Sequence, residues 1–164
     1  MLLWYCGLLA ATAIYNWPQR GLKNFPGVDL LNQLGYLLVF ELSSTLNHAP
    51  RVGWAVLVFG SLFAMHSHLL SEIMDVVPDR RACRQTTALI IGVIPSKLLV
   101  SAFLIAEAGL LLLILHHVIA AGCLACAAIW FVIDVFWIFR DRTCPRWFSR
   151  GLLLGWNCIA AASL

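Results

Sequence analysis

The chain has 164 residues, of which 62% are hydrophobic and only 12% are charged, with a formal net charge of +3. A soluble globular domain of this length is excluded, because such domains carry roughly twice that charged fraction. A nucleic-acid partner is not expected either, because no soluble domain is present to carry a basic stripe.

The apolar residues form long runs between short charged segments. The first run, Met1–Ile14, is too short to span a bilayer comfortably, and we interpret it as a helix that has lost its beginning. A signal peptide with Ala11-Thr12-Ala13 as its cleavage site is the weaker alternative, because a positively charged n-region is absent. Five later runs meet or approach the roughly 20 residues that a span needs: Val28–Leu46, Val52–Ser71, Pro95–Leu115, Val118–Phe139 and Gly151–Leu164.

These runs predict the fold class. In lipid a backbone must satisfy its own hydrogen bonds, so continuous apolar runs should be helices. We expect an all-α, multi-pass transmembrane helical bundle with about five full spans plus a truncated N-terminal one, forming a single domain over residues 1–164.

The cations predict the orientation. If every segment crosses, ten of the eleven Lys and Arg residues lie on one side of the membrane, and only Arg51 lies on the other. The positive-inside rule places those ten in the cytoplasm, where they face anionic lipid headgroups. We therefore expect an integral membrane protein of the cell membrane whose polar loops are cytoplasmic.

The segment after the second full span carries the strongest chemical signal. Asp75 and Asp79 are four residues apart, so on a helix they share a face. Two carboxylates on one face suit Mg²⁺, a hard cation that prefers oxygen ligands and phosphate co-ligands. Arginines, whose forked guanidinium groups suit phosphate oxygens, follow at once: Arg80, Arg81 and Arg84. The pattern indicates a magnesium-bound diphosphate at the mouth of the bundle.

A simpler interpretation stands beside this one. Many cytoplasmic loops carry mixed charge only for solvation, and a D-x-x-x-D spacing alone is a weak signal. Pro78 is also expected to interrupt any single helix through both aspartates, unless a new helix begins there.

Two motifs carry a family resemblance. Met74-Asp75-Val-Val-Pro-Asp79-Arg80-Arg81-Ala82, continued by Thr86-Thr87-Ala88 and Ile91-Gly92, resembles the second aspartate-rich motif of the UbiA-type prenyltransferase superfamily. Tyr15-Asn16-Trp17-Pro18-Gln-Arg20-Gly-Leu-Lys23 resembles the earlier Tyr/Lys loop of that superfamily, and Pro26–Asn32 resembles the start of its next helix. The resemblance covers nearly the whole chain.

The resemblance implies an intramembrane enzyme that moves a prenyl group from a prenyl diphosphate to a lipophilic acceptor. It implies that Asp75 and Asp79 hold Mg²⁺, while Tyr15 faces the allylic carbon or bonds a phosphate. The other implied substrate-binding residues are Lys23, Arg80 and Arg84 at the diphosphate, Glu72 beside the aspartates, and Asn32 in the chamber or between helices. Quinone precursors, carotenoids, tetrapyrroles and glycerol phosphate all remain open as acceptors.

The sequence departs from the family pattern. The segments match the fourth to ninth of nine spans, and the first aspartate-rich motif is missing. Glu72 stands where many members have aspartate, and Cys83 stands where glycine is usual. We therefore expect the chain alone to be inactive, with a missing N-terminal half or a second copy as the partner that completes it.

Other functions and other polar residues remain open. The alternative function is a non-catalytic integral membrane protein, such as a small transporter subunit or an assembly factor. Within the spans, Glu41, Glu107 and Asp134 are functional candidates because ionisable groups are costly in lipid. Asp134 is expected to pair with Arg140. His68 lies only two residues from another histidine, a spacing that does not suit a shared metal.

Overall fold

The structure is a computed structural model that describes residues 2–17, 21–145, 147–148, 150–151 and 154–155. Within these residues it is all-helical, as the sequence predicts, and no strand is present. The elements in chain order are α1 (Leu2–Asn16), the 3-10 helix η1 (Leu22–Asn24), α2 (Val28–Leu31), the 3-10 helix η2 (Asn32–Tyr36), α3 (Leu37–Leu46), α4 (Trp54–Arg81), α5 (Thr87–Ile91), α6 (Val93–Leu113) and α7 (Val118–Phe136).

Three of the described helices are long and apolar enough to cross a membrane, namely α4, α6 and α7. They correspond to three of the expected spans, and their length and composition are consistent with an integral membrane protein. The expected span over 28–46 is helical throughout but is divided into α2, η2 and α3. At the junction of α2 and η2 the Gln33 side-chain amide donates to the Asp29 carbonyl at 3.3 Å. Most of Gly151–Leu164 lies outside the described residues.

Helix α4 is longer than its apolar run. It continues past Ser71 to Arg81 and passes through Pro78, so the expected interruption at this proline is wrong. Proline removes one backbone donor, and here that loss falls only three residues before the helix ends. Asp75 and Asp79 therefore lie on one continuous helix.

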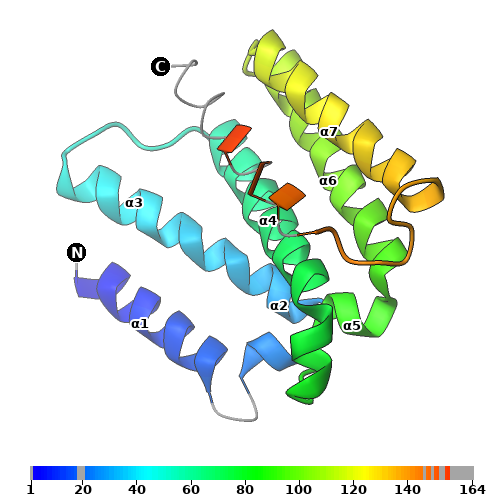
Figure 1. The fold of residues 1–164 in the computed structure, drawn as a ribbon. Coiled ribbons are helices and arrows are strands. Elements are labelled where there is room, and N and C mark those ends of the chain that lie inside the picture. Colours follow the sequence, from blue (N-terminus) through cyan, green and yellow to red (C-terminus); the bar gives the residue numbers. More distant parts are fainter. Residues whose placement is uncertain (1, 18–20, 146, 149, 152–153, 156–164) are drawn as a thin grey trace.

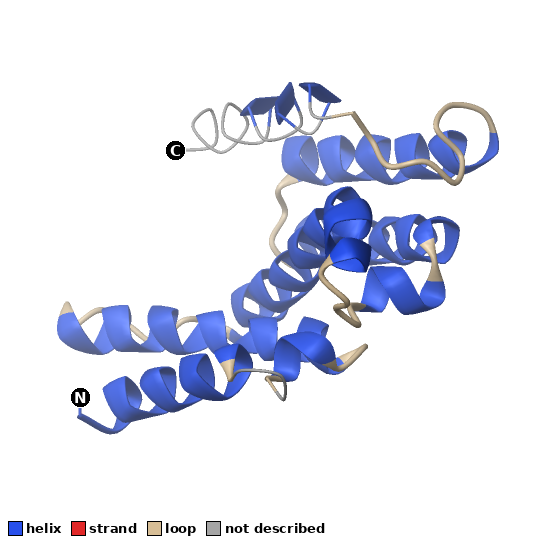
Figure 2. Ribbon diagram, turned by 60° about the horizontal axis from the view of Figure 1, so that its bottom comes forward, coloured by secondary structure: helices blue, strands red, loops and turns tan. Residues whose placement is uncertain are grey.

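The core lies where α4, α6 and α7 pack together. Figure 1 shows α4 running through the middle of the molecule, with α6 and α7 on one side and α1 and α3 on the other. Leu69, Ile73, Val100 and Phe131 are essentially inaccessible and join these three long helices. Helices α1 and α3 lie side by side and reach α4 mainly through η2 (Figures 1 and 2).

A short helix links the two parts. Helix α5 is followed directly by α6, and Gly92 between them has φ +90°, a conformation that glycine adopts without a steric penalty. This break turns the chain so that the first turn of α5 meets α2 and α4. The polar ends of α1, α2, α4 and α5 are thereby brought to one region.

Candidate functional site

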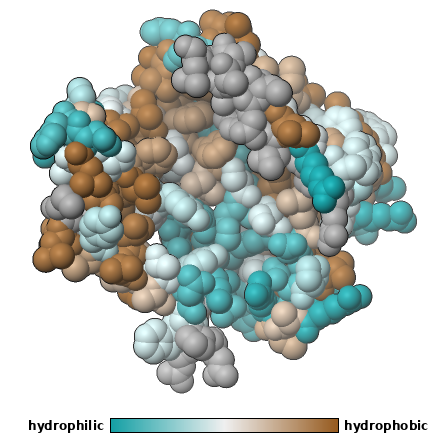
Figure 3. All heavy atoms as spheres, turned by 60° about the vertical axis from the view of Figure 1, so that its left-hand side comes forward, coloured by the Kyte–Doolittle hydropathy of each residue, from teal (hydrophilic) through white to brown (hydrophobic). Residues whose placement is uncertain are grey.

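A small polar cavity lies beside the C-terminal half of α4. Its volume is about 110 Å³, and α1, η1, α4 and the segment before α5 contribute to its walls. Its lining residues are Tyr15, Lys23, His68, Ser71, Glu72, Asp75, Asp79, Arg84 and Thr86. Figure 3 shows polar residues gathered in the centre of one face of the molecule, between hydrophobic flanks.

Most of the predicted site residues meet at this cavity. Six of the eight line it: Tyr15, Lys23, Glu72, Asp75, Asp79 and Arg84. Asn32 instead lines the adjoining cavity, and Arg80 is exposed and lines neither of the two. The α4 members follow spacings of three and four residues, which is why one helix face presents them together.

Arg84 folds back onto the motif. Its guanidinium lies 3.0 Å from the Asp79 carboxylate, and its backbone N–H donates to the Asp79 carbonyl at 3.1 Å. The reversal is made at Cys83, whose φ of +53° lies in the left-handed region that favours glycine. Asp79 is buried, whereas Asp75 is exposed at the cavity. The two aspartates thus share a face but differ in their surroundings.

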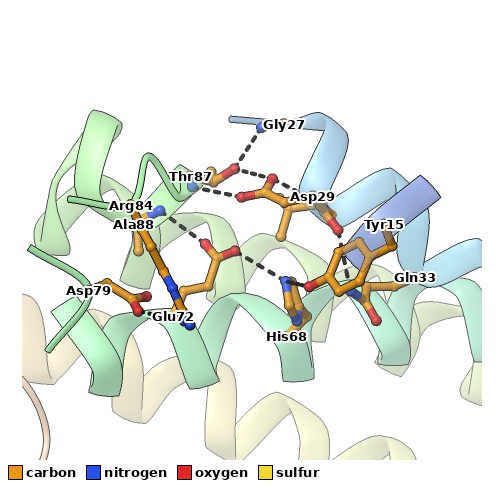
Figure 4. A network of polar contacts seen from close by, with 11 residues as sticks. Tyr15, Gly27, Asp29, Gln33, His68, Glu72, Asp79, Arg84, Thr87 and Ala88 are labelled. Carbon is orange, nitrogen blue, oxygen red and sulfur yellow. Dashed lines mark hydrogen bonds and ion pairs between the residues drawn. The ribbon is translucent and has the colours of Figure 1, made fainter. Parts of the chain in front are cut away.

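Two carboxylates hold the first turn of α5. Asp29, which is fully buried, accepts hydrogen bonds from the Thr87 backbone N–H at 2.8 Å and from the Thr87 hydroxyl at 2.5 Å. Glu72 accepts one from the Ala88 N–H at 3.1 Å. Figure 4 shows both side chains directed at this turn. They satisfy backbone donors that a helix start leaves without partners.

Asp29 is a site residue that sequence reasoning missed. It lies within the Pro26–Asn32 motif, but its partner is 58 residues away and no local pattern announces the pair. The Gly27 N–H also donates to the Thr87 hydroxyl, at 2.6 Å. The segment after η1 is therefore tied to α5 next to the cavity.

One histidine, His68, lines both this cavity and a second, adjoining cavity. His68 Nε2 lies 3.1 Å from Glu72 Oε1 and 3.5 Å from the Tyr15 hydroxyl (Figure 4). Tyr15 and His68 also line the adjoining cavity of about 220 Å³, between α1, η2 and α4. Its other lining residues are Leu8, Ala11, Thr12, Asn16, Asn32, Gln33, Gly35 and Tyr36. The two cavities thus share one wall.

Two oxygens at the first cavity are inaccessible to solvent. Within the described residues, Thr86 Oγ1 has no hydrogen-bond partner, and Glu72 Oε1 has only the His68 imidazole beside it, at 3.1 Å. Buried polar atoms without partners are uncommon, and they indicate places where water, an ion or a ligand completes the bonding.

The side chains at the cavity suit a magnesium ion that is also bound by phosphate, rather than a metal whose ligands all come from the protein. No group of three or more His, Cys, Asp or Glu side chains among the described residues is arranged to hold a metal. Asp75 and Asp79 do line one cavity with two basic residues, Lys23 and Arg84. Mg²⁺ commonly uses one or two carboxylates, keeps several waters and takes its remaining ligands from phosphates. The cavity therefore fits Mg²⁺ only together with such a ligand.

Two further buried pairs of ionisable side chains lie between the long helices. Lys97 and Asp134 are both fully buried, with Nζ 2.6 Å from Oδ2, so Asp134 pairs with Lys97 and not with Arg140 as expected. Lys97 belongs to α6, within the expected span Pro95–Leu115. Further along α6, Glu107 Oε1 lies 2.6 Å from Nδ1 of His66, within hydrogen-bond distance. Charges in lipid-facing helices are costly unless paired, and these pairs satisfy that requirement inside the bundle.

Comparison of the chain with protein-family models, with curated proteins and with solved structures finds no match. The candidate function therefore depends on the cavity and on the two sequence motifs that meet there.

Proposed function

We propose that this protein binds the magnesium complex of a prenyl diphosphate and takes part in transfer of the prenyl group to a lipophilic acceptor within the membrane. The observation that carries the proposal is the meeting of the Tyr15–Lys23 motif and the Asp75–Asp79 motif at one cavity, although they are separated by more than 50 residues of sequence. The resemblance to UbiA-type prenyltransferases supports the same assignment.

The charges of the cavity support a metal-bound anion. Two basic side chains, Lys23 and Arg84, face three carboxylates, those of Glu72, Asp75 and Asp79. With all of these groups ionised the cavity has a formal charge of −1, which repels a free diphosphate. A divalent cation reverses that balance and gives the carboxylates a function in anion binding.

In this proposal Asp75 and Asp79 hold Mg²⁺. The bound ion supplies electrostatic stabilisation of the negative charge on a leaving diphosphate. Lys23 and Arg84 donate hydrogen bonds to diphosphate oxygens, with Arg84 moving between Asp79 and the phosphate. Arg80, exposed one residue beyond Asp79, contacts the outer phosphate from the rim of the cavity.

The prenyl chain and the lipophilic acceptor lie in the adjoining cavity, on the other side of the wall that Tyr15 and His68 form. The adjoining cavity mixes apolar residues with amides and hydroxyls, so it suits a molecule with an apolar body and a polar end. Tyr15 lies on the common wall, where it faces the bond between the prenyl carbon and the diphosphate oxygen. As that bond breaks, the diphosphate takes the electron pair and the allylic carbon becomes open to attack by the acceptor.

A single carboxylate pair limits what this chain does alone. A prenyl diphosphate carries up to three negative charges, and the cavity offers two aspartates, one of them shared with Arg84. We expect the isolated chain to bind the magnesium complex without turning it over. Catalysis requires facing carboxylates from further helices or from a second copy of the chain.

Direct binding tests this proposal. The purified chain in nanodiscs is titrated with geranylgeranyl diphosphate in Mg²⁺ or in EDTA, and bound ligand is counted by filter retention of radiolabel. Binding is expected only with Mg²⁺, and Asp75→Asn, Asp79→Asn and Lys23→Gln should each weaken it at least tenfold. Glu41→Gln is the matched control, because Glu41 lines neither cavity.

The result also separates the two candidate functions. Binding that is unchanged by EDTA or by Asp79→Asn contradicts the prenyl diphosphate site and favours a non-catalytic membrane protein. In that case the carboxylates act only as the structural groups that hold α5 and Arg84.

A further inference from the structure

A groove lies on a different face of α4 from the polar cavity. Its volume is about 600 Å³, and it is lined by Met74, Val77, Pro78, Arg81, Ala82 and Thr143. The first four residues follow the helical spacing of one face, offset from the face that carries Glu72, Asp75 and Asp79. None of the groove residues lines the polar cavity.

The groove combines an apolar surface with one exposed cation, Arg81. Val77 is 51% exposed and belongs to a helix suited to cross a membrane, so its side chain is accessible to an alkyl chain. Arg81 is exposed, and in the described part of the chain its side chain makes no hydrogen bond or ion pair, unlike Arg84. An alkyl chain suits Val77 and its neighbours, and an anion suits Arg81.

The opposite wall is held in place by the buried Lys97–Asp134 pair. Lys97 Nζ donates to the carbonyl oxygens of Arg140 at 3.0 Å and of Arg142 at 2.9 Å. Asp134 Oδ1 accepts a hydrogen bond from the Phe139 N–H at 2.8 Å. The loop after α7 is therefore fixed by a fully buried ion pair, and this brings Thr143 to the groove beside α4.

That loop carries further positive charge next to Thr143. The side chains of Arg140 and Arg142 are exposed and have no side-chain partner among the described residues, and Asp141 is the acidic residue between them. Arg142 is the sequence neighbour of Thr143, which lines the groove together with Arg81. Exposed arginines at the ends of membrane-crossing helices lie at the depth of lipid headgroups.

We propose that this groove binds an anionic phospholipid. The phosphate meets Arg81 and the arginines of the 140–142 loop, and one acyl chain lies along Met74, Val77 and Pro78. Charge complementarity selects this occupant, because a zwitterionic lipid would leave the three arginines without a net opposite charge. The proposal does not depend on the prenyl diphosphate site.

The test uses the purified chain in detergent and counts bound lipid by native mass spectrometry. Short-chain phosphatidylglycerol is expected to bind at least tenfold more tightly than phosphatidylcholine of the same chain length. Arg81→Gln should weaken phosphatidylglycerol binding about fivefold, and Arg142→Gln should do so to a similar extent. Arg81→Lys should retain most of the binding, because the charge remains.

Arg51→Gln is the matched control, since Arg51 is an exposed arginine just before the other end of α4. Equal binding of the two lipids, or an equal loss in Arg51→Gln, would overturn the proposal. Displacement by inorganic phosphate at the same concentration as the lipid would also overturn it, because the apolar surface would then contribute nothing. Asp79→Asn should leave lipid binding unchanged, so the result is independent of the prenyl diphosphate site.

Discussion

At the scale of single residues, Cys83 shows how one backbone conformation serves the site. Its φ of +53° reverses the chain so that Arg84 returns to Asp79. A side chain in the left-handed region costs about 1 kcal/mol relative to glycine. We predict that Cys83→Gly raises the free energy of unfolding by roughly 0.5–1 kcal/mol while keeping the Arg84 contact. Denaturation in mild detergent measures this, and an unchanged or lower stability would contradict it.

A second prediction at this scale concerns thiol reactivity. Cys144 is buried in the loop after α7, and this burial raises the pKa of its thiol. The neighbouring Asp134 carboxylate raises that pKa further. A raised pKa leaves less thiolate at neutral pH, and thiolate is the form that reacts. Cys83, by contrast, is exposed to solvent.

We therefore predict that a water-soluble maleimide labels Cys83 at pH 7 much faster than Cys144. Single-cysteine variants that retain one of the two thiols provide the measurement, and labelling of Cys144 should rise as the pH is increased. Equal rates at pH 7 would show that the loop does not cover this thiol.

At the scale of elements, the position of α5 depends on carboxylates from other helices. Removing Asp29 leaves the Thr87 N–H and hydroxyl without their buried acceptor. We predict that Asp29→Ala lowers the free energy of unfolding by roughly 3 kcal/mol, since hydrogen bonds to charged groups contribute about 1.5–3 kcal/mol each. Asp29→Asn, which keeps one acceptor oxygen, should cost less.

The control for this prediction is Asp141→Ala, which removes an exposed carboxylate and should change stability by less than about 0.5 kcal/mol. Thermal unfolding followed by circular dichroism in detergent provides the comparison. If Asp29→Ala and Asp141→Ala unfold at the same temperature, the link between α2 and α5 is not a stabilising one.

At the scale of the whole molecule, the three long helices make a topological prediction. With α4, α6 and α7 all crossing, Arg80 and Arg142 face one side, whereas Arg51 and His116 face the other. The distribution of Lys and Arg assigns the first side to the cytoplasm. Arg20, also predicted to be cytoplasmic, lies outside the described residues.

Cysteine substitution at these positions in a cysteine-free background, followed by labelling of intact and permeabilised cells, measures the sidedness. We expect position 51 to react from outside and positions 80 and 142 only after permeabilisation. Labelling of positions 51 and 80 from the same side would mean that α4 does not cross.

Hydrophobicity by itself located the long helices. The apolar runs at 52–71, 95–115 and 118–139 correspond to α4, α6 and α7, because a long run of apolar side chains in lipid has only helical ways to satisfy its backbone. The four-residue spacing of Asp75 and Asp79 likewise placed both on one helix face at one cavity. The end of α4 was misplaced, because the helix continues through Pro78, whose missing N–H removes one intrahelical hydrogen bond without ending the helix.

Only the tertiary structure decided which polar groups meet across the sequence. Asp29 with Thr87, Lys97 with Asp134, and His66 with Glu107 pair across separations that no periodicity encodes. The sequence alone does not distinguish a charged residue that lies beside a loop from one that pairs with a residue of another helix. The packing of α5 against α2 settled the first pair, and the packing of α4 against α6 and of α6 against α7 settled the other two. A buried ionisable group is stable only where a partner comes within a few ångströms of it.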